Sequence, residues 1–313
     1  MNAVTERGST RRSMLLLALG VAVISLQDPI IKSLMGGYPV HEAIVIRSVA
    51  ALPIFAVLVW RLGGWRTLRE GRPGALIVRG LILVVSYTTY YLAFPAMPLA
   101  NVVALYFTAP LFVVALSRPM LGEHQGLGRW LAVTIGFIGA LIVAQPIGGA
   151  IGWSALLPIT AAAFYAFAQI LARRWGNAAS ATIMSFHQNA VYLVVALLFA
   201  AITAPLVSET TGSGSLNFLL RPWVLPTAHD LLLLALCGPI AVGATILLTK
   251  AYREAPPGAV TSLEYTMLIW ATFWGFVVFG EVPNAATIVG AVVIIASGLY
   301  AMTRASPARI PAP

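Results

Sequence analysis

Long apolar runs, separated by short polar connections, occupy almost the whole chain. Ten runs can be read from the sequence, at about residues 13–35, 42–60, 75–94, 99–116, 130–144, 153–171, 181–204, 231–249, 259–279 and 286–302. Most approach the roughly 20 residues that a helix needs to cross a bilayer, and none shows the alternation typical of a membrane β-strand. The pattern predicts an all-α polytopic membrane protein with ten transmembrane helices.

The composition excludes a soluble fold. Hydrophobic residues make up 59% of the 313 residues and charged residues 9%, whereas a soluble domain usually carries about 25% charged residues. The net charge of +9 does not indicate a nucleic-acid partner, because the basic residues separate the apolar runs instead of gathering on one face. A single cysteine, Cys237, excludes an intrachain disulfide and a cysteine-based metal site. We therefore expect the lipid bilayer as a partner, and neither a metal nor a cofactor.

Lys and Arg are concentrated at alternate connections, and such residues favour the cytoplasmic side of a membrane. One set of connections, together with both ends of the chain, holds Arg7, Arg11, Arg12, Arg61, Arg66, Arg69, Arg72, Arg79, Arg118, Arg129, Arg173, Arg174, Lys250, Arg253, Arg304 and Arg309. The other set holds only Arg221. The bias predicts cytoplasmic tails at 1–12 and 303–313, an even number of spans, and a multi-pass protein of the plasma membrane, with a bacterial inner membrane as the leading setting.

Two stretches about half a chain apart resemble each other. One runs from Pro98 to Glu123 and the other from Pro256 to Glu281, with equal Pro-to-Glu spacing and a Leu and a Thr at matching positions. The similarity predicts two five-helix repeats, at 13–146 and 147–302. Because five is odd, the second repeat enters the membrane upside down. Alternating-access transporters are commonly built from such inverted repeats around a central site.

The motifs of the fourth predicted helix make a family resemblance visible. Tyr-Phe-Thr-Ala-Pro at 106–110, Leu-Gly-Glu at 121–123 and the second Gly-Glu at 280–281 resemble the EamA family of the drug/metabolite transporter superfamily. The resemblance covers about residues 13–302. It implies two inverted five-helix repeats around a central cavity, and substrates among amino acids, related metabolites and drug-like amphiphiles. Leu268 stands where the first repeat has Pro110, so the two fourth helices are not expected to bend alike.

Ionisable side chains inside the apolar runs are the first candidates for function, because a charge in the bilayer is costly unless it is paired or hydrated. Glu264 lies eight residues past Pro256, about 12 Å along the ninth predicted helix. A carboxylate shielded from water binds a proton more readily, so Glu264 is the leading candidate for binding substrate and for proton coupling. A fixed packing role is its alternative. Asp28 is the second proton-coupling candidate, and its alternative is an ion pair with Lys32 one turn later.

Other polar residues inside the spans add weaker candidates. Gln27 lies beside Asp28, and His187 lies in the seventh predicted helix; the alternative for His187 is a satisfied packing group. Arg47 either extends outward to the interface or contacts a substrate carboxylate. Glu123 and Glu281, at the ends of matching helices, are expected to cap structure or to pair with basic loop residues rather than to touch substrate.

Tyrosines are the candidates for lining a pocket. A ring with one polar tip suits an amphipathic site, and the ring face attracts an ammonium group. Tyr90 and Tyr91 are instead expected in an aromatic belt at the membrane interface. The pocket-lining candidates are Tyr87, Tyr106, Tyr165, Gln169 and Tyr265.

These features together predict a secondary active transporter that moves small amphipathic metabolites by alternating access. Amino-acid export is the leading form, and import of a vitamin, nucleoside-like or sulfonium metabolite is the alternative. A membrane-embedded lipid enzyme, supported only by the adjacent His229 and Asp230, and a channel are weaker alternatives. The sequence contains no Walker-type phosphate loop, so an ion gradient is the expected energy source. We expect a monomer or a weak dimer.

Overall fold

The structure is a computed structural model, and it describes residues 15–69, 72–122, 126–144, 152–175, 179–204, 214–254 and 266–303. Within these ranges the regular structure is entirely helical. Seven helical segments are long and apolar enough to cross a membrane, and three further apolar helices, Trp130–Ala144, Thr266–Phe279 and Ala285–Ser297, are shorter. The predicted all-helical class is confirmed, whereas the count of ten spans stays a prediction.

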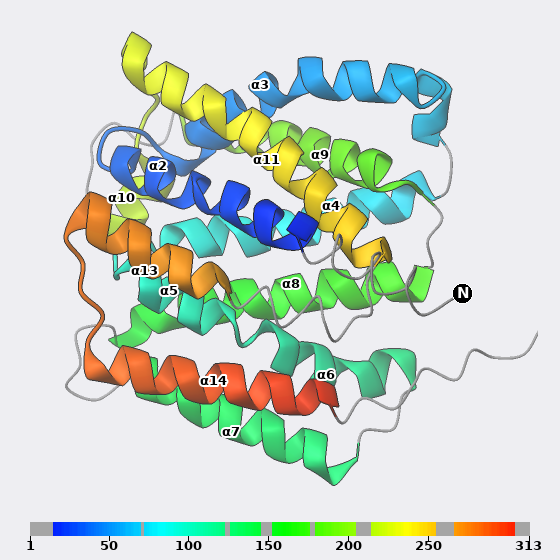
Figure 1. The fold of residues 1–313 in the computed structure, drawn as a ribbon. Helices are drawn as coiled ribbons and strands as arrows, with labels where there is room; N and C mark the ends of the chain where they lie inside the picture. Colours follow the sequence, from blue (N-terminus) through cyan, green and yellow to red (C-terminus); the bar gives the residue numbers. More distant parts are fainter. Residues whose placement is uncertain are drawn as a thin grey trace, which may run out of the picture.

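The helices follow the predicted apolar runs in chain order (Figure 1). The first span, Leu15–Leu34, contains α2 as its second part. The helices are α2 (Gln27–Leu34), α3 (Val40–Arg61), α4 (Pro73–Leu92), α5 (Leu99–Tyr106), α6 (Ala109–Leu121), α7 (Leu127–Ala144), α8 (Leu156–Trp175), α9 (Ala181–Thr203), α10 (Gly214–Leu220), α11 (Ala228–Glu254), α13 (Thr266–Phe279) and α14 (Ala285–Thr303), with short 3-10 helices η1 (Trp65–Arg69) and η2 (Gly152–Ala155).

Two of the predicted spans are broken near a proline. The first span is interrupted by a turn at Leu26, three residues before Pro29, and the fourth is divided into α5 and α6 at residues 107–108, just before Pro110. Proline has no backbone N–H to donate to the carbonyl four residues earlier. The sequence therefore weakens the helical hydrogen-bond ladder at both places, and the first break lies directly beside Gln27 and Asp28.

Four connections meet at one end of the bundle, on the left in Figure 1. Tyr38 donates to Asp230 at the start of α11, with 2.7 Å between the oxygens. The Ser215 hydroxyl of α10 donates to the Leu92 carbonyl at 2.7 Å, and Arg221 donates to the Gly36 carbonyl. Connections 35–39, 93–98 and 214–227 thus share this end, and 280–284 joins them through Glu281, which accepts from the Leu99 amide.

The helices of the two halves pack against each other in antiparallel pairs. Helices α7 and α14 lie together along one edge of the bundle, and α3, α9 and α11 form the opposite edge (Figure 1). Along each pair, residue numbers rise on one helix as they fall on the other. The neighbours are Gly136 with Ser297, Gly139 with Ile294 and Val143 with Gly290 for α7 and α14, and His41 with Phe199, Ser48 with Asn189 and Phe55 with Phe186 for α3 and α9.

Candidate functional site

A buried carboxylate lies where α2 meets α4. Asp28 stands in the first turn of α2, is only 6% exposed, and its Oδ2 accepts a hydrogen bond of 2.9 Å from the Tyr90 hydroxyl. Asp28 forms no ion pair with the described residues. Lys32, one turn later, pairs with Glu281 instead. The alternative of an Asp28–Lys32 pair within one helix is therefore wrong: the side chain of Lys32 reaches across to the connection between α13 and α14.

A second chain of polar contacts lies beside the Asp28–Tyr90 hydrogen bond and joins α2, α3, α4 and α9. The Gln27 amide nitrogen donates to the Tyr91 hydroxyl, and the same hydroxyl accepts from Arg47 Nη1 at 3.4 Å. The Arg47 guanidinium also lies over the Tyr192 ring, 5.6 Å from its centroid. Arg47 is 6% exposed, so it does not extend outward to the interface. The two polar chains are adjacent because Tyr90 and Tyr91 follow each other on α4.

Tyrosine rings contact one another in series beside these polar groups. The ring centroids are 5.6 Å apart for Tyr90 and Tyr91, 5.1 Å for Tyr90 and Tyr106, 5.6 Å for Tyr106 and Tyr165, and 5.6 Å for Tyr87 and Tyr192. The rings come from α4, α5, α8 and α9. We call this set of six rings, with Gln27, Asp28 and Arg47, the tyrosine cluster. It offers aromatic faces around a few polar groups, the arrangement expected for an amphipathic ligand.

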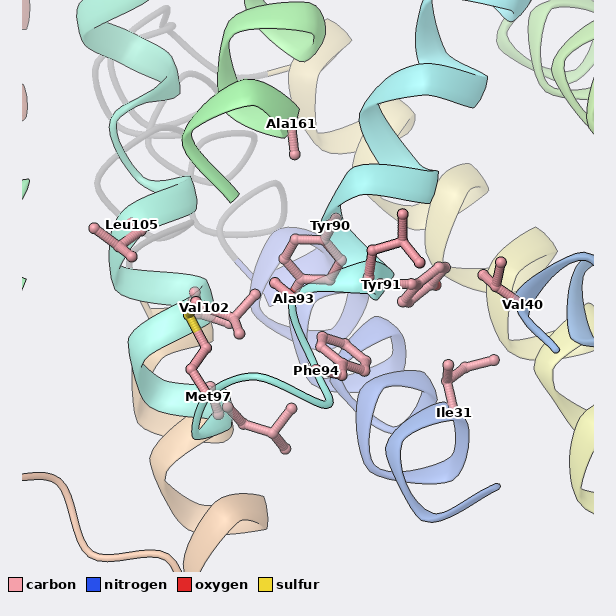
Figure 2. Packing of buried hydrophobic residues seen from close by; sticks show 14 of the residues in the cluster. Ile31, Val40, Tyr90, Tyr91, Ala93, Phe94, Met97, Val102, Leu105 and Ala161 are labelled. Carbon is pink, nitrogen blue, oxygen red and sulfur yellow. The ribbon is translucent and has the colours of Figure 1, made fainter. Parts of the chain in front are cut away.

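The expectation that Tyr90 and Tyr91 form an interfacial belt is wrong. Tyr90 is 7% exposed and Tyr91 2%, and Figure 2 shows both rings at the end of α4 beside Phe94, within the packed interior. Their hydroxyl groups do not need water, because Asp28 and Gln27 supply the hydrogen-bond partners.

Lys32 and Glu281 form a separate polar group at the end of the bundle where the connections meet. Lys32 pairs with Glu281, donates to the Met97 carbonyl at 3.1 Å and lies 5.1 Å from the Phe279 ring centroid. The other carboxylate oxygen of Glu281 accepts from the Leu99 amide, the first residue of α5, at 2.9 Å. The prediction that Glu281 caps structure is confirmed, but its basic partner Lys32 lies in helix α2 and not in a loop. Glu123 lies outside the described residues.

The remaining candidates are divided between the cluster and other places. Tyr87, Tyr106 and Tyr165 belong to the tyrosine cluster, and Gln169 is half-buried on α8, one turn beyond Tyr165. His187 is not among the groups that contact it: its Nδ1 lies 2.8 Å from the Ile183 carbonyl of its own helix, which fits the packing alternative. Glu264 and Tyr265 lie outside the described residues. No group of three or more metal-ligating side chains occurs in the described part of the chain.

Tyr192 was not predicted from the sequence as a site residue. Its hydroxyl lies 3.1 Å from the Gln188 amide nitrogen one turn earlier and 3.3 Å from the Leu83 carbonyl of α4, which fixes the ring under Arg47. The available signal was the Gln188–Tyr192 spacing, which places both side chains on one helix face.

Comparisons with known proteins agree with this architecture. The model of the EamA-like transporter family matches residues 11–145 and 152–303. A riboflavin transporter from Rhizobium johnstonii is 28% identical over 76% of this chain and 73% of its own length. An S-adenosylmethionine uptake transporter from Rickettsia bellii is 27% identical over 76% and 75%, and a pseudopaline exporter from Pseudomonas aeruginosa is 26% identical over 91% and 94%. A solved structure aligns at a TM-score of 0.60 and 16% identity, over 93% of this chain and 97% of that one, which shows a shared fold.

Proposed function

Because the chain belongs to the EamA-like transporter family and is a transporter of small metabolites rather than an enzyme, we propose that it carries its substrate in the tyrosine cluster by secondary active transport. The observation that supports this proposal is the buried Asp28 carboxylate, which has a tyrosine partner and no cationic partner among the described residues. A buried charge is usually paired or functional. A substrate ammonium or sulfonium group supplies the cationic partner that the described residues do not.

Counterflow in proteoliposomes tests the proposal. The vesicles are loaded with one unlabelled compound at a time, from a panel of amino acids, S-adenosylmethionine and riboflavin, and entry of the same labelled compound is followed. A carrier accelerates labelled entry when unlabelled substrate is inside, whereas a channel does not. Absence of counterflow for every compound would contradict the proposal.

Asp28→Asn identifies the role of the carboxylate in the same assay. We expect exchange of cationic or zwitterionic substrates to fall by about tenfold or more, the effect of losing a charge-assisted hydrogen bond. Asp230→Asn is the matched control, because Asp230 bonds Tyr38 at the end of the bundle. Equal effects of the two substitutions would remove Asp28 from substrate binding.

The names of the relatives fit more than one substrate. Amino-acid export stays a proposal for this chain, as does import of a sulfonium metabolite such as S-adenosylmethionine, and both kinds of substrate carry a cationic group for Asp28. A flavin-like vitamin is the second candidate, and the six neighbouring tyrosine rings favour it because they offer stacking faces. A flavin has no cationic group, so its transport is expected to tolerate Asp28→Asn. The same counterflow experiment therefore separates the two substrate classes.

Proton coupling and membrane orientation belong to the same proposal. We place the coupling proton on Glu264 or Asp28. Glu264→Gln is expected to abolish the pH dependence of transport with folding intact, and unchanged pH dependence would leave Asp28 as the candidate.

The setting is a bacterial inner membrane with both termini in the cytoplasm, and the working unit is a monomer or a weak dimer. The two stretches matched by the family model support repeats at 13–146 and 147–302.

A further inference from the structure

Arg47 is a buried cation without an anionic partner among the described residues. Its guanidinium has five N–H donors, yet within the described residues it forms one hydrogen bond, of 3.4 Å, to the Tyr91 hydroxyl. Its other contact is the face of Tyr192. No described carboxylate forms an ion pair with it. The distance to Tyr91 is at the long end for a hydrogen bond, so the described residues give Arg47 one weak hydrogen bond and no counter-charge.

An isolated charge removed from water costs several kcal/mol unless a counter-charge and hydrogen bonds compensate for it. A hydrocarbon side chain would fill this place in α3 at no such cost, so the guanidinium implies an anionic ligand. The rigid fork of arginine matches a carboxylate with two parallel hydrogen bonds. The position of Tyr192, fixed by Gln188 and by the Leu83 carbonyl, holds the guanidinium in one place.

Hydrogen-bond acceptors gather on the α2 side of the same cluster. Asp28 contributes its carboxylate, and the Gln27 side-chain oxygen is buried with no hydrogen-bond partner among the described residues. The Tyr91 hydroxyl contacts Gln27 and Arg47 at once. The cluster thus has a side that accepts hydrogen bonds from a cation and a side that donates them to an anion, with Tyr91 between the two.

We propose that Arg47 binds the carboxylate of the transported molecule while Asp28 and Gln27 bind its cationic group. The substrate class is then a dipolar metabolite with an amino-acid-type head, and purely cationic or uncharged compounds bind more weakly. This assignment rests on the proposed transport function, because it places the substrate in the tyrosine cluster. Arg47 acts as a specificity-determining residue that selects for the carboxylate.

Pairs of ligands that differ only in the carboxylate test the assignment. The probes are phenylalanine with phenethylamine, and S-adenosylmethionine with its decarboxylated analogue, each measured as a competitor of counterflow and as a thermal stabiliser of the purified protein. The wild-type protein is expected to favour the carboxylate-bearing member of at least one pair by about tenfold or more, the worth of a charge-assisted hydrogen bond. Equal binding within both pairs would overturn the assignment before any variant is made.

Substitutions of Arg47 then test whether this residue causes the preference for a carboxylate. Arg47→Gln is expected to bring the ratio within the favoured pair close to one while the amine binds as before, and Arg47→Lys is expected to keep part of the preference. Arg61→Gln is the matched control, an exposed arginine on the same helix, and it is expected to leave the ratio unchanged. If Arg47→Gln kept the full wild-type preference for the carboxylate-bearing ligand, the proposal would be overturned. If Arg47→Gln does not fold, Arg47→Lys decides, and a preference equal to that of the wild type would overturn the proposal. Absence of counterflow for every compound, by contrast, contradicts the transport function itself.

Discussion

At the scale of single residues, the hydrogen bond between Tyr90 and Asp28 defines the α2–α4 contact. Tyr90→Phe keeps the ring and its contacts but removes the only hydroxyl that donates to Asp28 Oδ2 within the described residues. Leaving a buried acceptor unsatisfied typically costs about 1–3 kcal/mol. We expect a lower thermal unfolding midpoint for the protein in detergent.

Tyr87→Phe is the control for this prediction. Tyr87 lies on the same helix and packs against Tyr91 and Tyr192 through its ring, and its hydroxyl forms no hydrogen bond with the described residues. The midpoint of Tyr87→Phe is expected to match that of the wild type. Equal destabilisation by the two substitutions would show that ring packing, and not the bond to Asp28, is responsible.

Residue types were predictable from the sequence, whereas their partners were not. Gln27, Asp28, Tyr87, Tyr106 and Tyr165 stand out as polar or aromatic groups inside apolar runs, and the structure brings them together. The expectation that Tyr90 and Tyr91 lie in an aromatic belt at the membrane interface was wrong. The contact of Tyr192 with Arg47 was not predicted. Sequence periodicity shows which residues share a helix face, but which way that face turns depends on neighbours far away in the chain.

At the scale of elements, the contact between α7 and α14 depends on glycine. A Cβ atom at Gly290 would lie 2.5 Å from Val143 Cγ2 and 2.6 Å from the Gly139 carbonyl oxygen. Backbone atoms cannot move aside as a side chain can, and small residues are what allow membrane helices to approach closely. Gly290→Ala is therefore expected to lower the free energy of unfolding by about 1–3 kcal/mol, the usual effect of overpacking.

Gly243→Ala provides the comparison within another helix. A Cβ atom at Gly243 of α11 would meet nothing within 4 Å, and alanine favours a helix over glycine by up to about 1 kcal/mol. Its unfolding midpoint is expected to equal or exceed that of the wild type. If Gly290→Ala were equally well tolerated, the close approach of α7 and α14 would not contribute to stability.

The elements themselves follow closely from local sequence. Apolar runs near bilayer length predicted where helices form, and the break in the first span lies three residues before Pro29. Glycines 136, 139 and 290 allow close helix packing, because a Cβ atom at each would meet a neighbour at a short distance. The short helix α10 was not predicted, because its seven residues are too few for hydrophobic periodicity to be read.

At the scale of the whole molecule, the inverted repeat stays a prediction, and it requires counterpart helices to be antiparallel. In a five-plus-five arrangement, α7 and α14 are counterparts, as are α3 and α9. Counterpart helices of upside-down copies must run in opposite directions, and the paired positions along both contacts do so. The ion pair between Lys32 and Glu281 then links the first half to the second at the end where four connections meet.

The same geometry predicts which connections face outward. If basic residues mark the cytoplasmic side, the end that carries Leu225 and Val282, 95% and 73% exposed, faces away from the cytoplasm, and Gly126 faces into it. In a Cys237→Ala background, Leu225→Cys and Val282→Cys are expected to react with an impermeant maleimide in spheroplasts, whereas Gly126→Cys is expected to react only after permeabilisation. The parent without cysteine sets the background. Labelling of Leu225→Cys and Val282→Cys from opposite sides would contradict the alternating helix directions that an inverted repeat requires.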